Sequence, residues 1–192
     1  MIDGIISRIE QSIEIKEKIL QDETLLQRIE DATLSIINAY QHNKKVLICG
    51  NGGSAADAQH IAAELSGRFY FDRKPLPAEA LHVNTSFLTA VANDYSYDAV
   101  YARMIDAIGN VGDILIAIST SGNSDNIIKA IESAKNKGMF IIGLTGENGG
   151  KMKNLCDNLL NVPSSDTPRI QETHITIAHI ICEWVEKELF GK

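Results

Sequence analysis

Two polar residues in the stretch GNGGSAADAQHIAAEL (residues 50–65), His60 and Glu64, stand four positions apart on a segment with helical character. At about 100° per residue, this spacing puts the two side chains within about 40° of each other, one turn apart. Such a pair can ligate one divalent ion or place a carboxylate base beside an imidazole. A solvated polar face is the alternative, but the glycine loop before the helix favours a functional site.

Two loops rich in glycine, serine and asparagine, residues 50–54 and 120–124, each follow an apolar strand. In the second loop, TSGNS preceded by Ser119, hydroxyl groups and backbone N–H groups at a helix start can hold a phosphate without a lysine. An N-cap cluster that binds no ligand remains the alternative. The first loop has neither dinucleotide-binding nor nucleoside triphosphate spacing, so a sugar or sugar phosphate suits it better.

Further candidate ligands lie near the C-terminus, in RIQETHITIAHIICEW. Gln171 and His179 are eight positions apart, which is about 80° around a helix and about 12 Å along it. Both could reach one ion only near the limit of their length, or one of them could serve a site on a neighbouring subunit. His174 has no such partner, and its position predicts a surface or core-edge histidine.

The adjacent pair Asn93 and Asp94 follows a short apolar helical segment. Two polar side chains at this place are compatible with the recognition of sugar hydroxyls. They are equally compatible with an ordinary helix end, and spacing does not decide between these interpretations.

Two helices are expected at the N-terminus, and the spacing of isoleucine and leucine predicts that they end near Asp22 and Gln41. Strands and helices alternate along the rest of the chain. Apolar runs predict strands at 44–49, 78–83, 113–119, 140–145 and 159–163, with helices at 55–65, 126–138 and 168–190. This alternation predicts a parallel sheet with helices on both faces. Ligands of such sheets bind outside the carboxyl ends of the strands, where both glycine-containing loops would lie.

Composition excludes several classes of protein. A chain of 192 residues with 44% hydrophobic content predicts one ordinary domain, and its net charge of −7 argues against binding of nucleic acid. The three cysteines, Cys49, Cys156 and Cys182, have no disulfide-framework or zinc-ribbon spacing, so a reducing cytosol is expected. The N-terminus has charges between isolated isoleucines, which is typical of neither a signal peptide nor a membrane span.

Taken together, GNGGSAADAQHIAAEL, AVANDYSYD, ISTSGNS, LTGENGG and IQETHITIAH, in this order, resemble the phosphoheptose isomerases of the sugar isomerase (SIS) fold family. The resemblance extends over essentially the whole chain. It implies a three-layer α/β/α sandwich with a five-stranded, flavodoxin-like parallel sheet after two N-terminal helices. It also implies a single SIS domain over 1–192, with 1–42 used in oligomerisation, and a cytoplasmic homotetramer with active sites at subunit interfaces.

The resemblance also implies a reaction and a set of site residues. The ketose sedoheptulose 7-phosphate would become D-glycero-D-manno-heptose 7-phosphate through an enediol(ate), the first step toward activated heptoses for lipopolysaccharide, capsule or other surface glycans. Glu64 would be the base and His179 the acid. The phosphate would be held by Ser119, Thr120, Ser121 and Ser124. The sugar would contact Asn51, Gly52, Gly53, Ser54, Asn93 and Asp94. One zinc ion per subunit would be bound by His60, Glu64, Gln171 and His179, with Glu64 and Gln171 also touching substrate.

Two other functions share this fold. One is a non-catalytic SIS protein that associates with the bacterial replication initiator, and the other is an SIS isomerase of a different sugar phosphate. The chain keeps both Glu64 and His179 on otherwise apolar helices, and catalysis explains such costly polar groups better than binding does. The phosphate loop alone would serve any sugar phosphate, so only the full set of residues favours the heptose enzyme.

Overall fold

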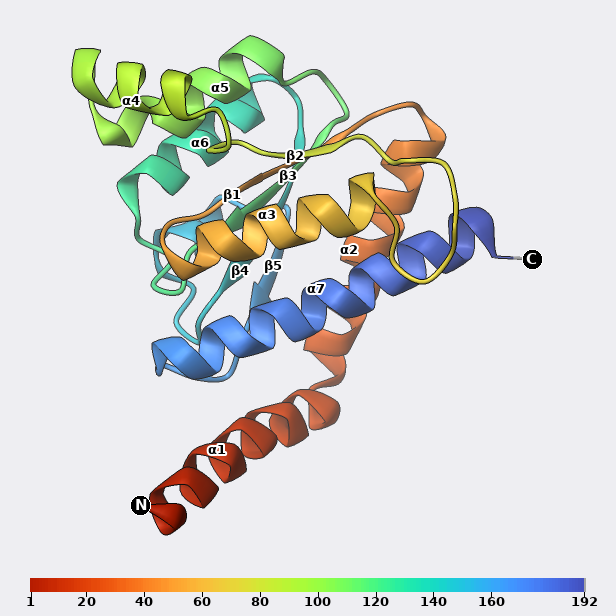
Figure 1. Cartoon of the computed structure of the whole chain (residues 1–192), viewed down its shortest axis with the longest axis vertical. Coiled ribbons are helices and arrows are strands. Elements are labelled where there is room, and N and C mark those ends of the chain that lie inside the picture. The colour runs from red at the N-terminus through yellow and green to blue at the C-terminus, as the bar shows by residue number, and fades with distance from the viewer. Residues whose placement is uncertain (192) are drawn as a thin grey trace.

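A single parallel sheet organises the computed structural model, which describes residues 1–191 (Figure 1). Within these residues five strands pair in the order β2-β1-β3-β4-β5. Their bounds are β1 Val46–Cys49, β2 Ala78–Ala80, β3 Ile114–Ile118, β4 Phe140–Thr145 and β5 Asn158–Asn161. This is the flavodoxin-like order, so the predicted fold class is confirmed. Strand β4 has the predicted bounds, and the other four strands are shorter than the apolar runs that predicted them.

Helices cover both faces of the sheet. They are α1 Ile2–Gln21, α2 Glu23–Gln41, α3 Gly53–Ser66, α4 Thr85–Asp94, α5 Val100–Ile108, α6 Asp125–Asn136 and α7 Thr167–Phe190, with 3₁₀ turns η1 Tyr97–Ala99 and η2 Gly150–Asn154. Helices α2, α3 and α7 pack on one face, and α5 and α6 on the other. Helix α1 extends away from the sheet (Figure 1). The sequence predicted the two N-terminal helices correctly but missed α5.

The strands are apolar on both faces because both faces are covered. In β1, Val46 and Ile48 belong to the core beneath α2, α3 and α7, while Leu47 and Cys49 belong to the core beneath α5 and α6. Near-continuous apolar strands of this kind are typical of parallel sheets. No helix within residues 1–191 has the length and apolar character needed to cross a membrane.

The sheet brings the two candidate loops together. Strands β1 and β3 are neighbours in register, with Cys49 opposite Ala117, so the loops that follow them leave the same edge side by side. The chain proceeds from β1 to β2 on one side and then returns to β3 on the other. The loops therefore lie at the point where the strand order reverses, which is where open α/β sheets bind ligands.

One sequence prediction about α7 is wrong. His174 does not lie at the surface or core edge, because it is only 1% exposed. Its Nε2 donates to the carbonyl oxygen of Thr145 at 3.2 Å, which joins α7 to the end of β4. Burial lowers the pKa of His174 to about 4, although the hydrogen bond to Thr145 opposes this shift. The imidazole is therefore neutral in the folded protein at neutral pH.

We expect His174 to make the protein less stable in mild acid. Between the folded pKa of about 4 and the ordinary value of 6.5, the unfolded chain binds more protons. The free energy of unfolding is therefore highest, as far as His174 determines it, above about pH 6.5, and it falls by about 3 kcal/mol toward pH 4. Urea unfolding at pH 7 and pH 4.5 measures this loss, which should be smaller in His174→Gln. An equal loss in both proteins would contradict this assignment.

Candidate active site

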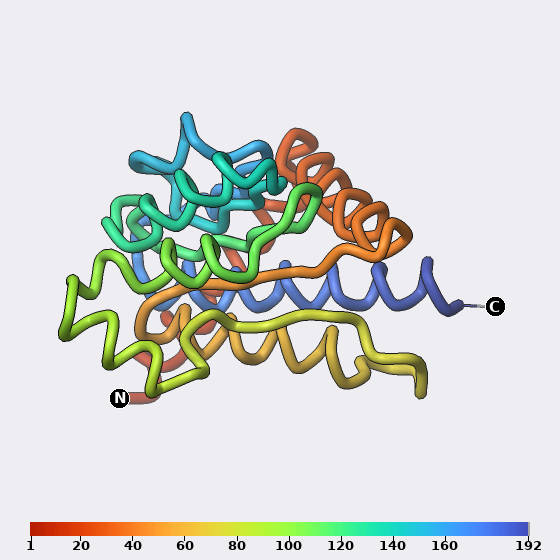
Figure 2. Tube along the Cα trace, turned by 90° about the horizontal axis from the view of Figure 1, so that it is seen from above, coloured from red at the N-terminus to blue at the C-terminus, as the bar shows by residue number. Residues whose placement is uncertain are grey.

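The central feature of the site is the parallel packing of α3 against α7 (Figures 1 and 2). A Cβ atom at Gly53 would lie only 2.7 Å from Nε2 of Gln171, and further along the two helices the rings of His60 and His179 are 4.9 Å apart. The seven residues from Gly53 to His60 span about 10.5 Å of helix, close to the 12 Å from Gln171 to His179. The two helices therefore run in register. Residues of both helices meet at a first level, Gly53 with Gln171, and at a second level, His60 with His179.

Three potential ligands meet at the second level. Nε2 of His60 lies 3.2 Å from Oε1 of Glu64 and 3.3 Å from Nε2 of His179. One ligand atom from each of the three residues falls within 4.8 Å of the other two. His60 is exposed, while Glu64 and His179 are partly buried. The predicted pair on α3 and the predicted histidine on α7 thus come together within one chain.

These three groups suit a zinc ion by chemistry and by spacing. Zinc binds imidazole nitrogen and carboxylate oxygen at about 2.0–2.2 Å, and catalytic zinc sites use three protein ligands and one open position. Two ligands of a tetrahedral ion at such distances lie about 3.3 Å apart, which matches the two short separations around His60. The same spacing also allows a hydrogen-bonded acid-base pair between His60 and Glu64.

Gln171 lies at the first level, beside the glycine loop. Its side-chain amide occupies the space that a Cβ atom at Gly53 would need. A larger residue at position 53 would have to displace this flexible side chain. The contact joins the second of the two adjacent glycines to α7, while the role of Gln171 as a metal ligand remains a prediction.

The glycine loop itself is held by amide side chains. Asn51 and Asn126 exchange two hydrogen bonds of 2.9 and 2.8 Å, and the Tyr97 hydroxyl donates to Oδ1 of Asn51 at 3.2 Å. Gly52 adopts φ = +56°, a conformation that favours glycine, and caps the start of α3. Ser54 is buried in the first turn of α3. Asn126 and Tyr97 were missed by the sequence analysis, since neither stands beside the motif it supports.

The second loop presents hydroxyl groups at the start of α6. The Oγ atoms of Ser119 and Ser124 lie 3.0 Å apart. Within the described chain the Ser124 side chain does not cap α6, which disfavours the simple N-cap interpretation. Gly122 has φ = +66°, and a Cβ atom there would collide with the Gly149 carbonyl, so the loop packs tightly on the GENGG turn. The structure therefore leaves the hydroxyl groups and the amino end of α6 together, as a phosphate site requires.

The structure gives less direct support to the other predicted substrate contacts. Thr120 accepts a hydrogen bond from the Gly146 N–H through its carbonyl, whereas the Ser121 hydroxyl accepts from the Asn123 N–H. Asn93 and Asp94 end α4, are both exposed and hydrogen-bond to each other at 2.9 Å. The following turn, η1, carries the tyrosine that reaches the glycine loop. The roles of Asn93 and Asp94 in sugar recognition remain predictions.

Asp57 is a further acidic group that the sequence analysis missed. It is partly buried, and its Oδ2 has no hydrogen-bond partner within residues 1–191. Burial raises the pKa of Asp57, while His60 and His179 oppose this shift. This carboxylate can therefore influence the two imidazoles through its charge. Its signal in the sequence was its position three residues before His60, on the same helix face.

Comparisons with known proteins agree with this geometry. The SIS domain family matches residues 9–146. The phosphoheptose isomerase of Aneurinibacillus thermoaerophilus is 56% identical over 190 residues, covering 99% of this chain and 96% of the relative. That of Clostridium acetobutylicum is 56% identical over 192 residues, covering 100% and 98%.

Among solved structures, phosphoheptose isomerase GmhA from Neisseria gonorrhoeae superimposes with a TM-score of 0.91 at 40% identity, covering 96% of this chain and 98% of that one. The match therefore extends over nearly the whole chain. On fold, sequence identity and coverage together, the chain belongs to the phosphoheptose isomerases, a family with the SIS domain.

Proposed function

We propose that this protein is an aldose-ketose isomerase that converts sedoheptulose 7-phosphate to D-glycero-D-manno-heptose 7-phosphate. The observation that carries the proposal is the convergence of His60, Glu64 and His179 within 4.8 Å, in a chain 56% identical to phosphoheptose isomerases. Catalysis explains a carboxylate and two imidazoles held together near the glycine loop better than non-catalytic binding does. The product would feed the synthesis of heptose-containing surface glycans.

The reaction moves a carbonyl group from C2 to C1 of the sugar. Glu64 removes a proton from C1, and the resulting carboxylic acid returns a proton to C2. His179 protonates the oxygen on C2 and accepts the proton of the hydroxyl on C1. The ketose is thereby converted to an enediol(ate) with a double bond between C1 and C2. The enediol(ate) then gives the aldose, whose carbonyl group is at C1. His60, in contact with both groups, holds the base and the acid in register.

The remaining site residues bind and orient the substrate. Ser119, Thr120, Ser121 and Ser124 would hold the phosphate at the start of α6, while the glycine loop contacts the sugar. The hydrogen bonds between Asn51 and Asn126 tie these two loops together. Zinc bound by His60, Glu64 and His179, with Gln171 as a fourth candidate ligand, would polarise the substrate oxygens and stabilise the negative charge of the enediolate.

We further propose a homotetramer with active sites at subunit interfaces. Helix α1 exposes a row of isoleucines at helical spacing, namely Ile2, Ile5, Ile6, Ile9 and Ile13. Leu26 and Leu34 on α2 and Ile180 and Trp184 on α7 are also exposed. Large exposed apolar surfaces mark interaction sites. Light scattering should give four times the 21.0 kDa chain mass, and a monomer at all concentrations would overturn this assembly.

A cytoplasmic location is proposed from the cysteines. Cys49, Cys156 and Cys182 are free thiols, and the first and third are buried. Burial raises the pKa of Cys156 and Cys182 to about 12, so neither is a ready nucleophile. Free thiols are typical of a reducing compartment.

The test of the function is turnover with a panel of sugar phosphates. The protein should isomerise sedoheptulose 7-phosphate with a higher kcat/KM than pentose or hexosamine phosphates. Faster turnover of one of those would favour an SIS isomerase of another sugar phosphate. Binding of sugar phosphates without turnover of any would favour the non-catalytic alternative.

A further inference from the structure

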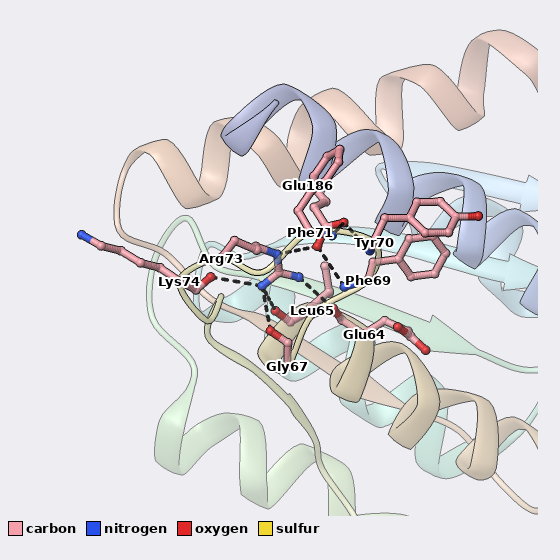
Figure 3. Close-up of polar contacts among 9 residues, drawn as sticks. All are labelled: Glu64, Leu65, Gly67, Phe69, Tyr70, Phe71, Arg73, Lys74 and Glu186. Atoms are coloured by element: carbon pink, nitrogen blue, oxygen red, sulfur yellow. Dashed lines mark hydrogen bonds and ion pairs between the residues drawn. The ribbon is translucent and has the colours of Figure 1, made fainter. Parts of the chain in front are cut away.

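A buried ion pair lies at the far end of the α3–α7 contact (Figure 3). Nε of Arg73, in the segment between α3 and β2, donates to Oε1 of Glu186 on α7 at 2.8 Å, and the two side chains are 2% and 1% exposed. Glu186 also accepts the backbone N–H groups of Phe69, Tyr70 and Phe71. Burial would raise the pKa of Glu186, but these N–H groups and Arg73 lower it. Both carboxylate oxygens are therefore satisfied without water.

The other side of the Arg73 guanidinium faces the end of α3. Nη2 donates to the carbonyl of Glu64 at 2.8 Å, and Nη1 donates to those of Leu65, Gly67 and Lys74 at 2.9, 3.1 and 3.1 Å. The last carbonyls of a helix lack partners within the helix, and a cation there is favourable. Arg73 thus fixes the backbone of the residue that carries the proposed base (Figure 3).

The same network reaches the proposed acid. The ring of Phe69, whose N–H is held by Glu186, lies 5.8 Å from the ring of His179, centroid to centroid. Tyr70 packs edge-on against Phe69 at 4.6 Å. Glu186 itself lies seven residues, or about two turns, beyond His179 on α7. One ion pair therefore secures the backbone at Glu64, the aromatic wall beside His179 and the helix that bears His179.

We propose that Arg73 and Glu186 are positioning residues that set the relation between Glu64 and His179 for proton transfer. This inference rests on the proposed function, because it assigns both residues a role through the acid and the base. Neither residue is placed in contact with substrate. A buried ion pair is weak evidence for stability alone, since desolvation offsets much of its attraction. Its value here is the geometry that it imposes on two helices.

Glu186→Gln and Arg73→Lys test the inference by separating kcat from KM. Gln keeps the size of Glu but offers one acceptor oxygen where the network uses two. Lys keeps the positive charge, but its single ammonium group cannot donate hydrogen bonds to Glu186 and to four carbonyl oxygens at once. Supporting-residue changes and misplacement by about 1 Å cost 10- to 100-fold in rate. We therefore expect kcat to fall about 10- to 100-fold, with KM changed less than about threefold because the phosphate loop is untouched.

Asp113→Asn provides a matched control. Asp113 is also a buried carboxylate that accepts backbone N–H groups, from Lys45 and Asn110, and pairs with a cation, Nζ of Lys45, at 2.6 Å. It lies just before β3, at the amino end of the strand and away from the site loops. This variant should lose stability but keep the kcat and the pH profile of the wild-type protein.

The outcomes distinguish this inference from the proposed function. Circular dichroism first establishes that each variant is folded at the assay temperature, and Arg73→Lys supplies the milder change if Glu186→Gln does not fold. A wild-type kcat and pH profile in a folded Arg73 or Glu186 variant would overturn the positioning role. Equal losses of kcat in Asp113→Asn would also overturn it. Absence of turnover by the wild-type protein would instead remove the proposed function.

Discussion

Glu64→Gln should all but abolish isomerisation, with kcat reduced by about 100- to 10,000-fold. Glutamine has nearly the same shape as glutamate and can still contact His60, but its amide cannot accept the proton from C1. General-base catalysis contributes about 10²- to 10⁴-fold. A coupled or mass-spectrometric assay of sedoheptulose 7-phosphate conversion measures the loss.

Substrate binding should survive this substitution. The phosphate is assigned to the loop from Ser119 to Ser124, so calorimetry should give a Kd for sedoheptulose 7-phosphate within a few-fold of the wild-type value. Glu132→Gln, an exposed position on α6, serves as the control and should leave kcat unchanged. Near-normal turnover by Glu64→Gln would remove Glu64 from the mechanism.

His179→Ala should cost most of the activity, with kcat lower by about 100-fold or more. The change removes the group assigned to protonate the carbonyl oxygen, and it also removes the ring that contacts His60 at 3.3 Å. Steady-state kinetics with sedoheptulose 7-phosphate measure the loss.

His42→Ala is the matched control, because His42 is an exposed histidine at the end of α2. It should keep the kcat of the wild-type protein. If His179→Ala behaved in the same way, the acid would have to be sought elsewhere in the site.

Local patterns were sufficient to predict most of the fold. The apolar runs located all five strands, because strands buried on both faces need side chains that are apolar on both. Asp22 broke the N-terminal helices as expected, and its side chain caps α2 by accepting the Leu25 N–H at 3.0 Å. Helix α5 was missed, since it follows a polar, tyrosine-containing stretch with no clear start signal.

The site was only half predictable. Spacing along α3 paired His60 with Glu64, but no pattern within α7 could show that His179 would meet them while Gln171 met Gly53. That result depends on the parallel packing of two helices more than 100 residues apart in sequence. The longest-range supports were also invisible, because Glu186 in a sequence looks like any charge on a helix surface. Its burial follows from the segment that folds over it.

The proposed mechanism is tested most directly by isomerisation of sedoheptulose 7-phosphate in deuterium oxide, followed by NMR. Glu64 takes a proton from C1 and its carboxylic acid can exchange with solvent before it returns a proton to C2, so the wild-type protein should form an aldose with at least some deuterium at C2. Glu64→Gln should form no such product. An unchanged ketose with the wild-type protein, or the same labelled aldose with Glu64→Gln, would contradict the proposed mechanism.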